Sequence, residues 1–339
     1  MMATPAQGDP SPRRVVLHAD DLGMNRAVNR GILAAFTDGL LTSTSILTNA
    51  PGCSEALRSW TDLLAMQRRQ ILPSSAARRR LGDDGLRPFD LGVHLNLTQG
   101  RPLTRKRFPQ ALLDARGRFP GAGGLLWRLL RVGREHRSAI QAELCAQIER
   151  VLDYGLAPTH LNGHQYVEMM PIVSEIIPEL LEKYSIGSVR IACESSLART
   201  TLIHRLQPAV WGLAHVKRHF ARRFSHQIRS RLVRGIPPRA PDTFFGTAHA
   251  GRIDLRLMAL FLDRSPAGLT EIGLHPAATP VEPEFHANGD GWADPLAHLR
   301  PGELEMLCAP RLCEMLEERR IQLSRLPGEV PTLRRLAAA

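Results

Sequence analysis

Residues 15–23 read VVLHADDLG, and this stretch decides how the rest of the chain is interpreted. Its apolar, β-branched start predicts a buried strand, while Gly23 and Asn25 predict a turn and the N-cap of a helix. Asp20 and Asp21 therefore fall at the carboxyl end of the first strand, where the chain turns. Two like charges at one point are costly unless a cation or a proton is shared there. A metal ligand beside a general base fits this pattern, and a solvated Asp-Asp turn is the alternative.

Three histidines occupy similar places at strand ends. His94 lies in LGVHLNL (91–97), His164 ends HLNGH (160–164), and His275 lies in EIGLHP (271–276). A single histidine in an apolar strand is usually a core residue, but three at strand ends, together with the Asp-Asp pair, favour a site. One carboxylate and two neutral imidazoles commonly form an open divalent-metal site with room for water.

The chain alternates predicted strands and helices, which is typical of a parallel α/β fold. The predicted strands are 14–19, 43–48, 90–97, 158–162, 187–192, 242–246, 270–275 and 320–324. The predicted helices are 25–38, 53–67, 138–154, 171–184, 200–232, 254–263 and 302–319. Eight strands with helices between most of them predict a (β/α) barrel, in which chemistry lies at the carboxyl ends of the strands.

The sequence also resembles the YdjC-like carbohydrate deacetylase family, which includes chitooligosaccharide deacetylase and the hopanoid-biosynthesis-associated deacetylases. The matching pieces occur in the family's order and span residues 14 to about 324. They are HADDLG (18–23), Asn29 with Gly31-Ile32, GLLTSTS (39–45), LGVHL (91–95) with Thr98 and Gly100, HLNGHQ (160–165), Val189-Arg190, and Thr270-Glu271 with His275-Pro276.

The resemblance implies a distorted, TIM-like (β/α) barrel in a single domain that hydrolyses an N-acetyl group of an amino sugar, in an oligosaccharide or a glycolipid. Asp21, His94 and His164 match the metal ligands of the family, and Asp20 matches its catalytic base. His275 matches the histidine that assists the leaving group. The cofactor so implied is one divalent ion, with magnesium and zinc as the main alternatives.

Two departures concern the pocket. Family members often carry His-x-His where this chain has His164-Gln165-Tyr166, and an Arg-rich insertion occupies 68–88. Segments 100–136 and 276–301 are predicted to form walls of a substrate pocket, with plain surface loops as the alternative.

Several neighbouring residues are expected to support the site. Asn162 and His160 are candidates to fix His164. Arg190 is expected to pair with Asp20 or Asp21, and Glu271, deeper in the barrel, to orient a neighbour rather than react.

The amino-acid composition limits which binding partners are expected. Lys and Arg exceed Asp and Glu by 44 to 33, a net charge of +11, yet aromatic residues make up only 5% and form no ladder within the basic clusters, so nucleic acid is not expected as a partner. A stripe of apolar residues every fourth position in 213–234 predicts a barrel helix. The alternative is a peripheral contact with the inner membrane or with a partner, and the membrane contact would suit a lipid-linked substrate. A homodimer is also common for such folds.

The sequence predicts a disordered lead at 1–12, the deacetylase barrel domain at 13–326 and a tail at 327–339. The lead has no apolar core typical of a secretory signal, and no apolar run is long enough for a membrane span. The five scattered cysteines suit free thiols in a reducing cytoplasm.

Two other functions stay open. A metal-free glycosidase would use Asp20 with a second carboxylate, but would leave the histidines unused. A non-catalytic protein that binds sugar or a membrane surface on the same barrel is favoured by Tyr166.

Overall fold

The computed structural model describes residues 12–68, 89–192, 222–224, 228, 240–279 and 291–326. Several predictions fall outside these residues, wholly or for the most part. They are the N-terminal lead, the Arg-rich insertion 68–88, the helix 200–232 with its apolar stripe at 213–234, part of the wall 276–301, and the C-terminal tail.

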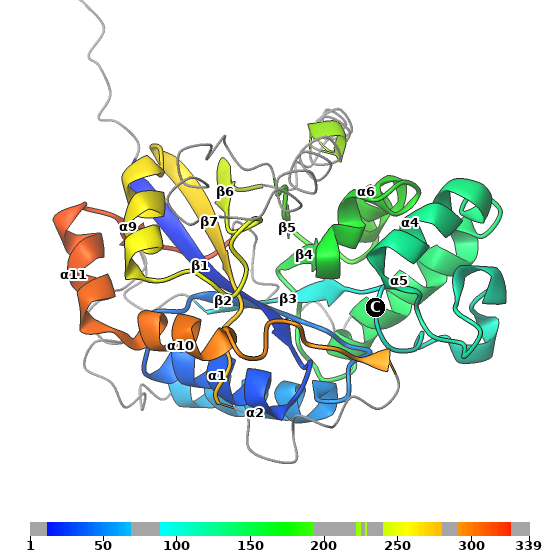
Figure 1. The fold of residues 1–339 in the computed structure, drawn as a ribbon, viewed down its shortest axis with the longest axis horizontal. Helices are drawn as coiled ribbons and strands as arrows, with labels where there is room; N and C mark the ends of the chain where they lie inside the picture. Colours follow the sequence, from blue (N-terminus) through cyan, green and yellow to red (C-terminus); the bar gives the residue numbers. More distant parts are fainter. Residues whose placement is uncertain are drawn as a thin grey trace, which may run out of the picture.

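A parallel sheet of eight strands forms the centre of the fold, and it is curled like an incomplete barrel (Figure 1). The strands are β1 (Arg13–Leu22), β2 (Ser43–Ile46), β3 (Asp90–Leu95), β4 (His160–Gly163), β5 (Ser188–Val189), β6 (Thr243–Phe245), β7 (Gly268–Leu274) and β8 (Gln322–Leu323). Each overlaps a strand predicted from the sequence, so the predicted distorted barrel is confirmed.

Helices surround the sheet, as expected for βα units. They are α1 (Arg26–Thr37), α2 (Cys53–Arg68), α4 (Gly121–Val132), α5 (Arg137–Leu152), α6 (Val173–Lys183), α9 (Leu255–Arg264), α10 (Arg300–Cys308) and α11 (Pro310–Glu318), with 3-10 turns η1 (Arg105–Arg107), η2 (Gln110–Leu112) and η3 (His164–Met169). Within the described part of the chain, no helix has the length and apolar content to cross a membrane.

The strand order departs from a regular eight-stranded barrel. The order is β5-β4-β3-β2-β1-β7-β6, with β8 off this path and paired to β1. Since β7 pairs with β1 from Arg13 to Ala19, β8 must share the other edge of β1 with β2. The two-residue β8 pairs with Arg14 and Val15, and β2 takes over at His18.

The predicted helix 302–319 is wrong as a single element. The structure has two helices, α10 and α11, separated at Ala309, whose φ of −69° and ψ of 130° are extended. Pro310 causes the break, because a proline disfavours helical geometry in the residue before it. The segment 100–136, predicted only as a wall or loop, contains η1, η2 and the helix α4.

The packing of α1 fixes the loop that carries His275. A Cβ added to Gly31 would lie 2.3 Å from the Cα of Ala277, so glycine allows α1 to touch the chain directly after β7. The Ala278 N–H donates to the carbonyl of Ala27 across this contact at 2.9 Å. The end of β7 is therefore held close to the helix that follows β1.

Candidate metal centre

A bulge at the end of β1 lets two consecutive carboxylates enter one site. In the pairing of β1 with β2, Ala19 lies opposite Thr44 and Leu22 lies opposite Ile46, so one extra residue is inserted in β1 at Asp20-Asp21. Asp21 adopts a left-handed φ of 72°. Neighbouring side chains of a regular strand point to opposite faces, and a bulge changes that direction. This explains how Asp20 and Asp21 both reach the histidines.

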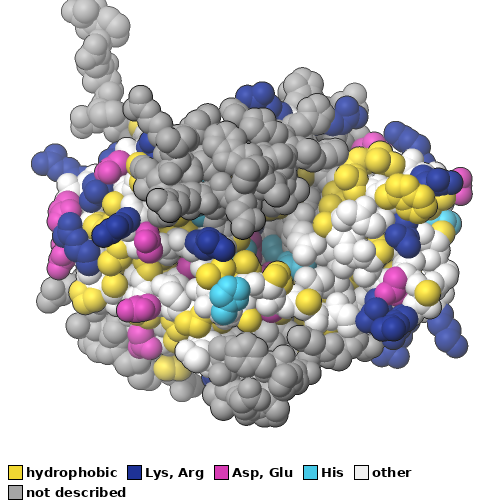
Figure 2. All heavy atoms as spheres, viewed as in Figure 1, with side chains coloured by type: hydrophobic (Ala, Val, Ile, Leu, Met, Phe, Trp, Pro, Cys, Tyr) yellow, Lys and Arg dark blue, Asp and Glu magenta, His cyan; other side chains and the backbone are white. Residues whose placement is uncertain are grey.

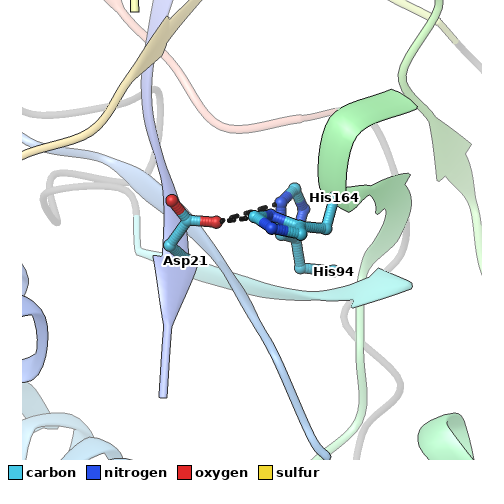
Figure 3. Close-up of side chains that lie close together, drawn as sticks. All are labelled: Asp21, His94 and His164. Atoms are coloured by element: carbon cyan, nitrogen blue, oxygen red, sulfur yellow. Dashed lines mark hydrogen bonds and ion pairs between the residues drawn. The ribbon is translucent and has the colours of Figure 1, made fainter. Parts of the chain in front are cut away.

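Asp21, His94 and His164 converge in one buried cluster (Figure 3). Oδ1 of Asp21 lies 3.0 Å from Nδ1 of His164 and 3.4 Å from Nε2 of His94, and the candidate ligand atoms all lie within 4.8 Å of one another. Ligand atoms bound about 2.0–2.2 Å from one ion lie roughly 3–3.6 Å apart, so the two distances from Asp21 fit a shared divalent ion. The three residues come from the carboxyl end of β1, late β3 and the start of η3.

Asn162 orients His94, not His164. The two residues are register partners on β3 and β4, and Nδ1–H of His94 donates to Oδ1 of Asn162 at 2.8 Å. This leaves Nε2 of His94 free to face Asp21. The prediction that Asn162 fixes His164 is therefore wrong, because direct strand pairing places it beside His94.

His160 also lies away from His164. Its Nδ1 interacts with the hydroxyl of Thr159 at 2.9 Å, and its ring packs edge-on against His18 at 4.9 Å. A Cβ at Gly92 would lie 2.2 Å from the His160 ring, so this glycine makes room for it. Burial lowers the pKa of His160 well below its usual range. His160 is thus a neutral core residue beneath the site.

Arg300 holds the second oxygen of Asp21. Its Nη2 lies 2.7 Å from Oδ2 of Asp21, and its Nε donates to both carboxylate oxygens of Asp294 at 3.0 and 2.8 Å. Burial alone would raise the pKa of Asp21, but the Arg300 charge and His164 hold it well below its usual range. Sequence reasoning missed Arg300.

Asp20 is fixed by a chain of buried charges. Nη1 of Arg190 donates to its Oδ2 at 2.7 Å, and Nε of Arg190 donates to Glu271 at 2.7 Å. The amide of Asn162 donates to Oδ1 of Asp20 at 3.0 Å. Although burial favours the neutral acid, Arg190 and His94 hold the pKa of Asp20 well below its usual range. The expected pairing of Arg190 with one of the two aspartates is found at Asp20.

His275 also lies near the carboxylate of Asp20. Its Nε2 lies 3.8 Å from Oδ2 of Asp20, and its Nδ1 has no hydrogen-bond partner among the described residues. Its backbone N–H donates to Glu303 at 2.5 Å, which fixes the chain at the end of β7. Burial lowers the pKa of His275 to about 4, so its imidazole is neutral near pH 7.

The pKa of His94 shifts in the opposite direction from that of His275. Burial alone would lower its pKa, but the charges and hydrogen bonds of Asp20 and Asp21 raise it above the usual value. A cation bound at the cluster would therefore compete with a proton on this imidazole.

Trp292 forms part of the described wall beside the cluster. Its ring centre lies 6.5 Å from that of His164. A Cβ at Gly100 would lie 2.4 Å from its indole nitrogen, and Gly100 has a left-handed φ of 73°. The N–H of Ala293 donates to Gln99 at 3.0 Å. Parts of the two predicted walls, 100–136 and 276–301, thus meet next to His164.

The sequence profile of the YdjC-like protein family matches residues 14–318, which includes all five predicted site residues. The chain belongs to the YdjC-like family. The resemblance predicted from the ordered motifs is confirmed.

Proteins named carbohydrate deacetylase align with this YdjC-like chain over most of its length. One from Geobacillus stearothermophilus is 29% identical over 92% of this chain and 96% of its own. One from Mus musculus is 28% identical over 93% of this chain and 97% of its own. A crystal structure of a putative cellobiose-phosphate cleavage protein from Enterococcus faecalis has a TM-score of 0.65 at 20% identity, covering 93% of this chain and 98% of that one. That structure supports the fold.

Proposed function

We propose that this chain is a metal-dependent hydrolase that removes the N-acetyl group from an amino sugar in an oligosaccharide or glycolipid. The observation that carries the proposal is the buried convergence of Asp21, His94 and His164 beside Asp20, in a chain that aligns with carbohydrate deacetylases over more than nine-tenths of its length.

The metal would be held by Oδ1 of Asp21, Nε2 of His94 and Nδ1 of His164. One oxygen and two imidazole nitrogens suit zinc and are compatible with magnesium or manganese. A divalent ion supplies Lewis acidity, which activates water and polarises the acetamide carbonyl. The network around Asp21 and His94 keeps these donors oriented without large movement, because Arg300 and Asn162 hold their other polar atoms.

Asp20 is placed to take the proton of the attacking water. Its carboxylate is ionised at neutral pH, and among the described residues its Oδ2 lies 2.7 Å from Nη1 of Arg190 and 3.8 Å from Nε2 of His275. Arg190 disfavours long residence of a proton on Asp20, so the carboxylate is suited to pass it onward.

His275 is the acceptor for that proton and the donor to the leaving group. Because its imidazole is neutral at rest, it can receive the proton at Nε2 from Asp20 and then donate it to the departing amine nitrogen. The carbon–nitrogen bond then breaks with a neutral amine as leaving group, and the acetic acid formed becomes acetate by losing its remaining proton to solvent. The proton taken from water is thus the proton delivered to the amine.

The glycosidase alternative agrees less well with these charges. Such an enzyme keeps one carboxyl protonated as the general acid, which requires a raised pKa. The pKa values of Asp20 and Asp21 are instead both lowered by partners that include Arg190 and Arg300. Neither Asp20 nor Asp21 therefore suits the general acid of such a pair.

The test is acetate release from a panel of N-acetylated mono-, oligosaccharides and glycolipids, with metal content measured on the same samples. Asp20→Asn should retain the metal and lose most of the rate, because it removes a base. Asp21→Asn should lose metal affinity itself. Equal metal loss in both variants would contradict the assignment of roles, and wild-type protein that binds sugars without releasing acetate would support a binding protein instead.

A further inference from the structure

One segment within the described residues carries a large excess of positive charge. Residues 101–137 contain ten Lys and Arg and two Asp and Glu, a net charge of +8 out of +11 for the whole chain. The segment includes η1, η2 and α4 and reaches the start of α5. Neither the metal cluster nor the proton route described above uses any of these charges.

The same segment exposes apolar surface. In the part of the chain that the structure describes, the large hydrophobic residues that are exposed are Met66, Trp127, Leu130 and Tyr154, at 37%, 56%, 69% and 38%. The two most exposed lie three residues apart on α4, so they share one face of that helix. The opposite face is buried through Leu125 and Leu129.

Arginines surround this apolar pair. The guanidinium carbons of Arg131 and Arg128 lie 4.8 and 5.8 Å from the centre of the Trp127 ring. The Arg134 side chain is 80% exposed, and its Nη2 lies 3.5 Å from a carboxylate oxygen of Glu175. We call Trp127, Leu130, Arg131 and Arg134 the α4 patch.

We propose that the α4 patch docks the protein on an anionic lipid membrane. Tryptophan and leucine among arginines on one helix face combine burial in the interfacial region with attraction to anionic headgroups. A soluble anionic polymer would gain little from Leu130, and a second copy of the patch would oppose the same positive charges.

The α4 patch lies at the same end of the barrel as the metal cluster. Since β3 and β4 are parallel, α5 between them must run back against the strand direction, and its start lies near the carboxyl ends of the strands. α4 ends next to the start of α5, so it lies at the end of the barrel that holds Asp21, His94 and His164. Figure 2 shows histidine side chains inside a central hollow, with hydrophobic, Lys and Arg side chains gathered beside it over α4 and α6. Docking would therefore turn the hollow toward the headgroup layer.

The experiment is co-sedimentation of the full chain with phosphatidylcholine vesicles, with and without phosphatidylglycerol. Wild-type protein should bind the anionic vesicles. Trp127→Ser/Leu130→Ser should lower partitioning by about tenfold or more, since two exposed side chains no longer enter the lipid. Arg131→Gln/Arg134→Gln should lower it roughly fivefold for each arginine removed.

Matched controls carry the same chemical changes elsewhere. Met66→Ser/Tyr154→Ser removes the other two exposed hydrophobic side chains, and Arg252→Gln/Arg256→Gln removes two exposed charges near α9. Both should bind vesicles like wild type, and all variants should melt at about the temperature of wild type, which shows that they are folded.

Three results would overturn the proposal. The first is equal loss of vesicle binding in the controls and the patch variants. The second is wild-type protein that binds heparin but no vesicle, which would indicate a soluble polyanion. The third is a dimer by analytical ultracentrifugation that Trp127→Ser/Leu130→Ser abolishes, in a protein that does not sediment with vesicles.

Discussion

Asn162 forms hydrogen bonds with both His94 and Asp20, and different substitutions of Asn162 remove these two bonds selectively. Its Oδ1 accepts from Nδ1–H of His94 at 2.8 Å, and its Nδ2 donates to Oδ1 of Asp20 at 3.0 Å. Leucine at this position removes both contacts and keeps the same branched arrangement of heavy atoms. Aspartate retains an acceptor for His94 but replaces the donor toward Asp20 with a second acceptor.

The expected magnitude for Asn162→Leu follows from the His94 contact. Loss of this bond leaves a buried N–H without a partner, which costs about 1–3 kcal/mol. Loss of one orienting contact around a metal typically weakens affinity about 10–100-fold, or roughly 1.4–2.8 kcal/mol, so the two ranges agree. Asn162→Asp should keep the metal, while the added carboxylate raises the pKa of Asp20 and moves the acid limb of activity to higher pH.

The assay is competition for zinc with a chromophoric chelator, together with thermal unfolding of each variant. Gln147→Leu is the matched control, because Gln147 is a buried amide whose hydrogen bonds go to Asn96 and Glu143. It should lose stability but bind zinc like wild type. If Asn162→Leu also binds zinc as tightly as wild type, Asn162 does not orient a ligand and the reasoning about His94 is wrong.

Three further predictions concern protons and buried charge. His275→Ala should slow acetate release from an N-acetyl sugar by about 10²–10⁴-fold with metal content unchanged. Hydrolysis of an aryl acetate should slow much less, because its leaving group needs no proton. Equal loss of rate on both substrates would make His275 a positioning residue. Because the pKa of His94 is raised, metal binding should displace a proton from its imidazole near and below neutral pH. The apparent metal affinity should therefore fall as the pH drops through that pKa, by up to about tenfold per pH unit. Calorimetry in buffers of different ionisation enthalpy measures the released proton, and a metal affinity that does not change with pH in this range would contradict the prediction. Arg190→Met should destabilise the fold by about 3–5 kcal/mol, since it leaves Asp20 and Glu271 as uncompensated buried charges. The depressed pKa of Asp20 contributes stability above its unfolded value near 3.8 that is lost as the pH falls through the lowered value, so this variant should unfold less steeply toward acid than wild type; an unchanged melting temperature at pH 7 would contradict the role of Arg190.

Much of the sheet was predictable from local patterns, since β1, β3, β4 and β7 each combine apolar residues with a polar residue at or just after the carboxyl end. Parallel strands bring such ends together, so His94 and His164 could be expected near Asp21. The prediction could not say how adjacent aspartates would both reach them. That depends on the bulge in β1 and the left-handed φ of Asp21, which arise from pairing with β2.

The polar residues that support the ligands were harder to predict because their partners are distant in sequence. Arg300 reaches Asp21 from 279 positions away, and nothing in its local sequence marks it as a site residue. The partner of Asn162 could have been found by aligning the predicted strands, because His94 and Asn162 are direct register partners. Proximity to His164 in sequence was the misleading signal.

Two helix predictions failed: the break between α10 and α11 was not predicted, and neither was the helix α4. Pro310 ends α10 through its effect on Ala309, within a run that otherwise has helical periodicity. The start of α4, Gly121-Ala122-Gly123-Gly124, has low helix propensity, and the helix is stabilised by burying Leu125 and Leu129. Tertiary packing therefore decides this helix.

The most direct test of the central proposal is to titrate metal-free wild-type protein with a divalent ion while measuring acetate release from an N-acetylated oligosaccharide. The proposed site predicts no release without the ion, and a rise that saturates near one ion per chain for wild type but not for Asp21→Asn. Acetate release at full rate in the presence of a strong chelator, from protein shown to hold no metal, would contradict it.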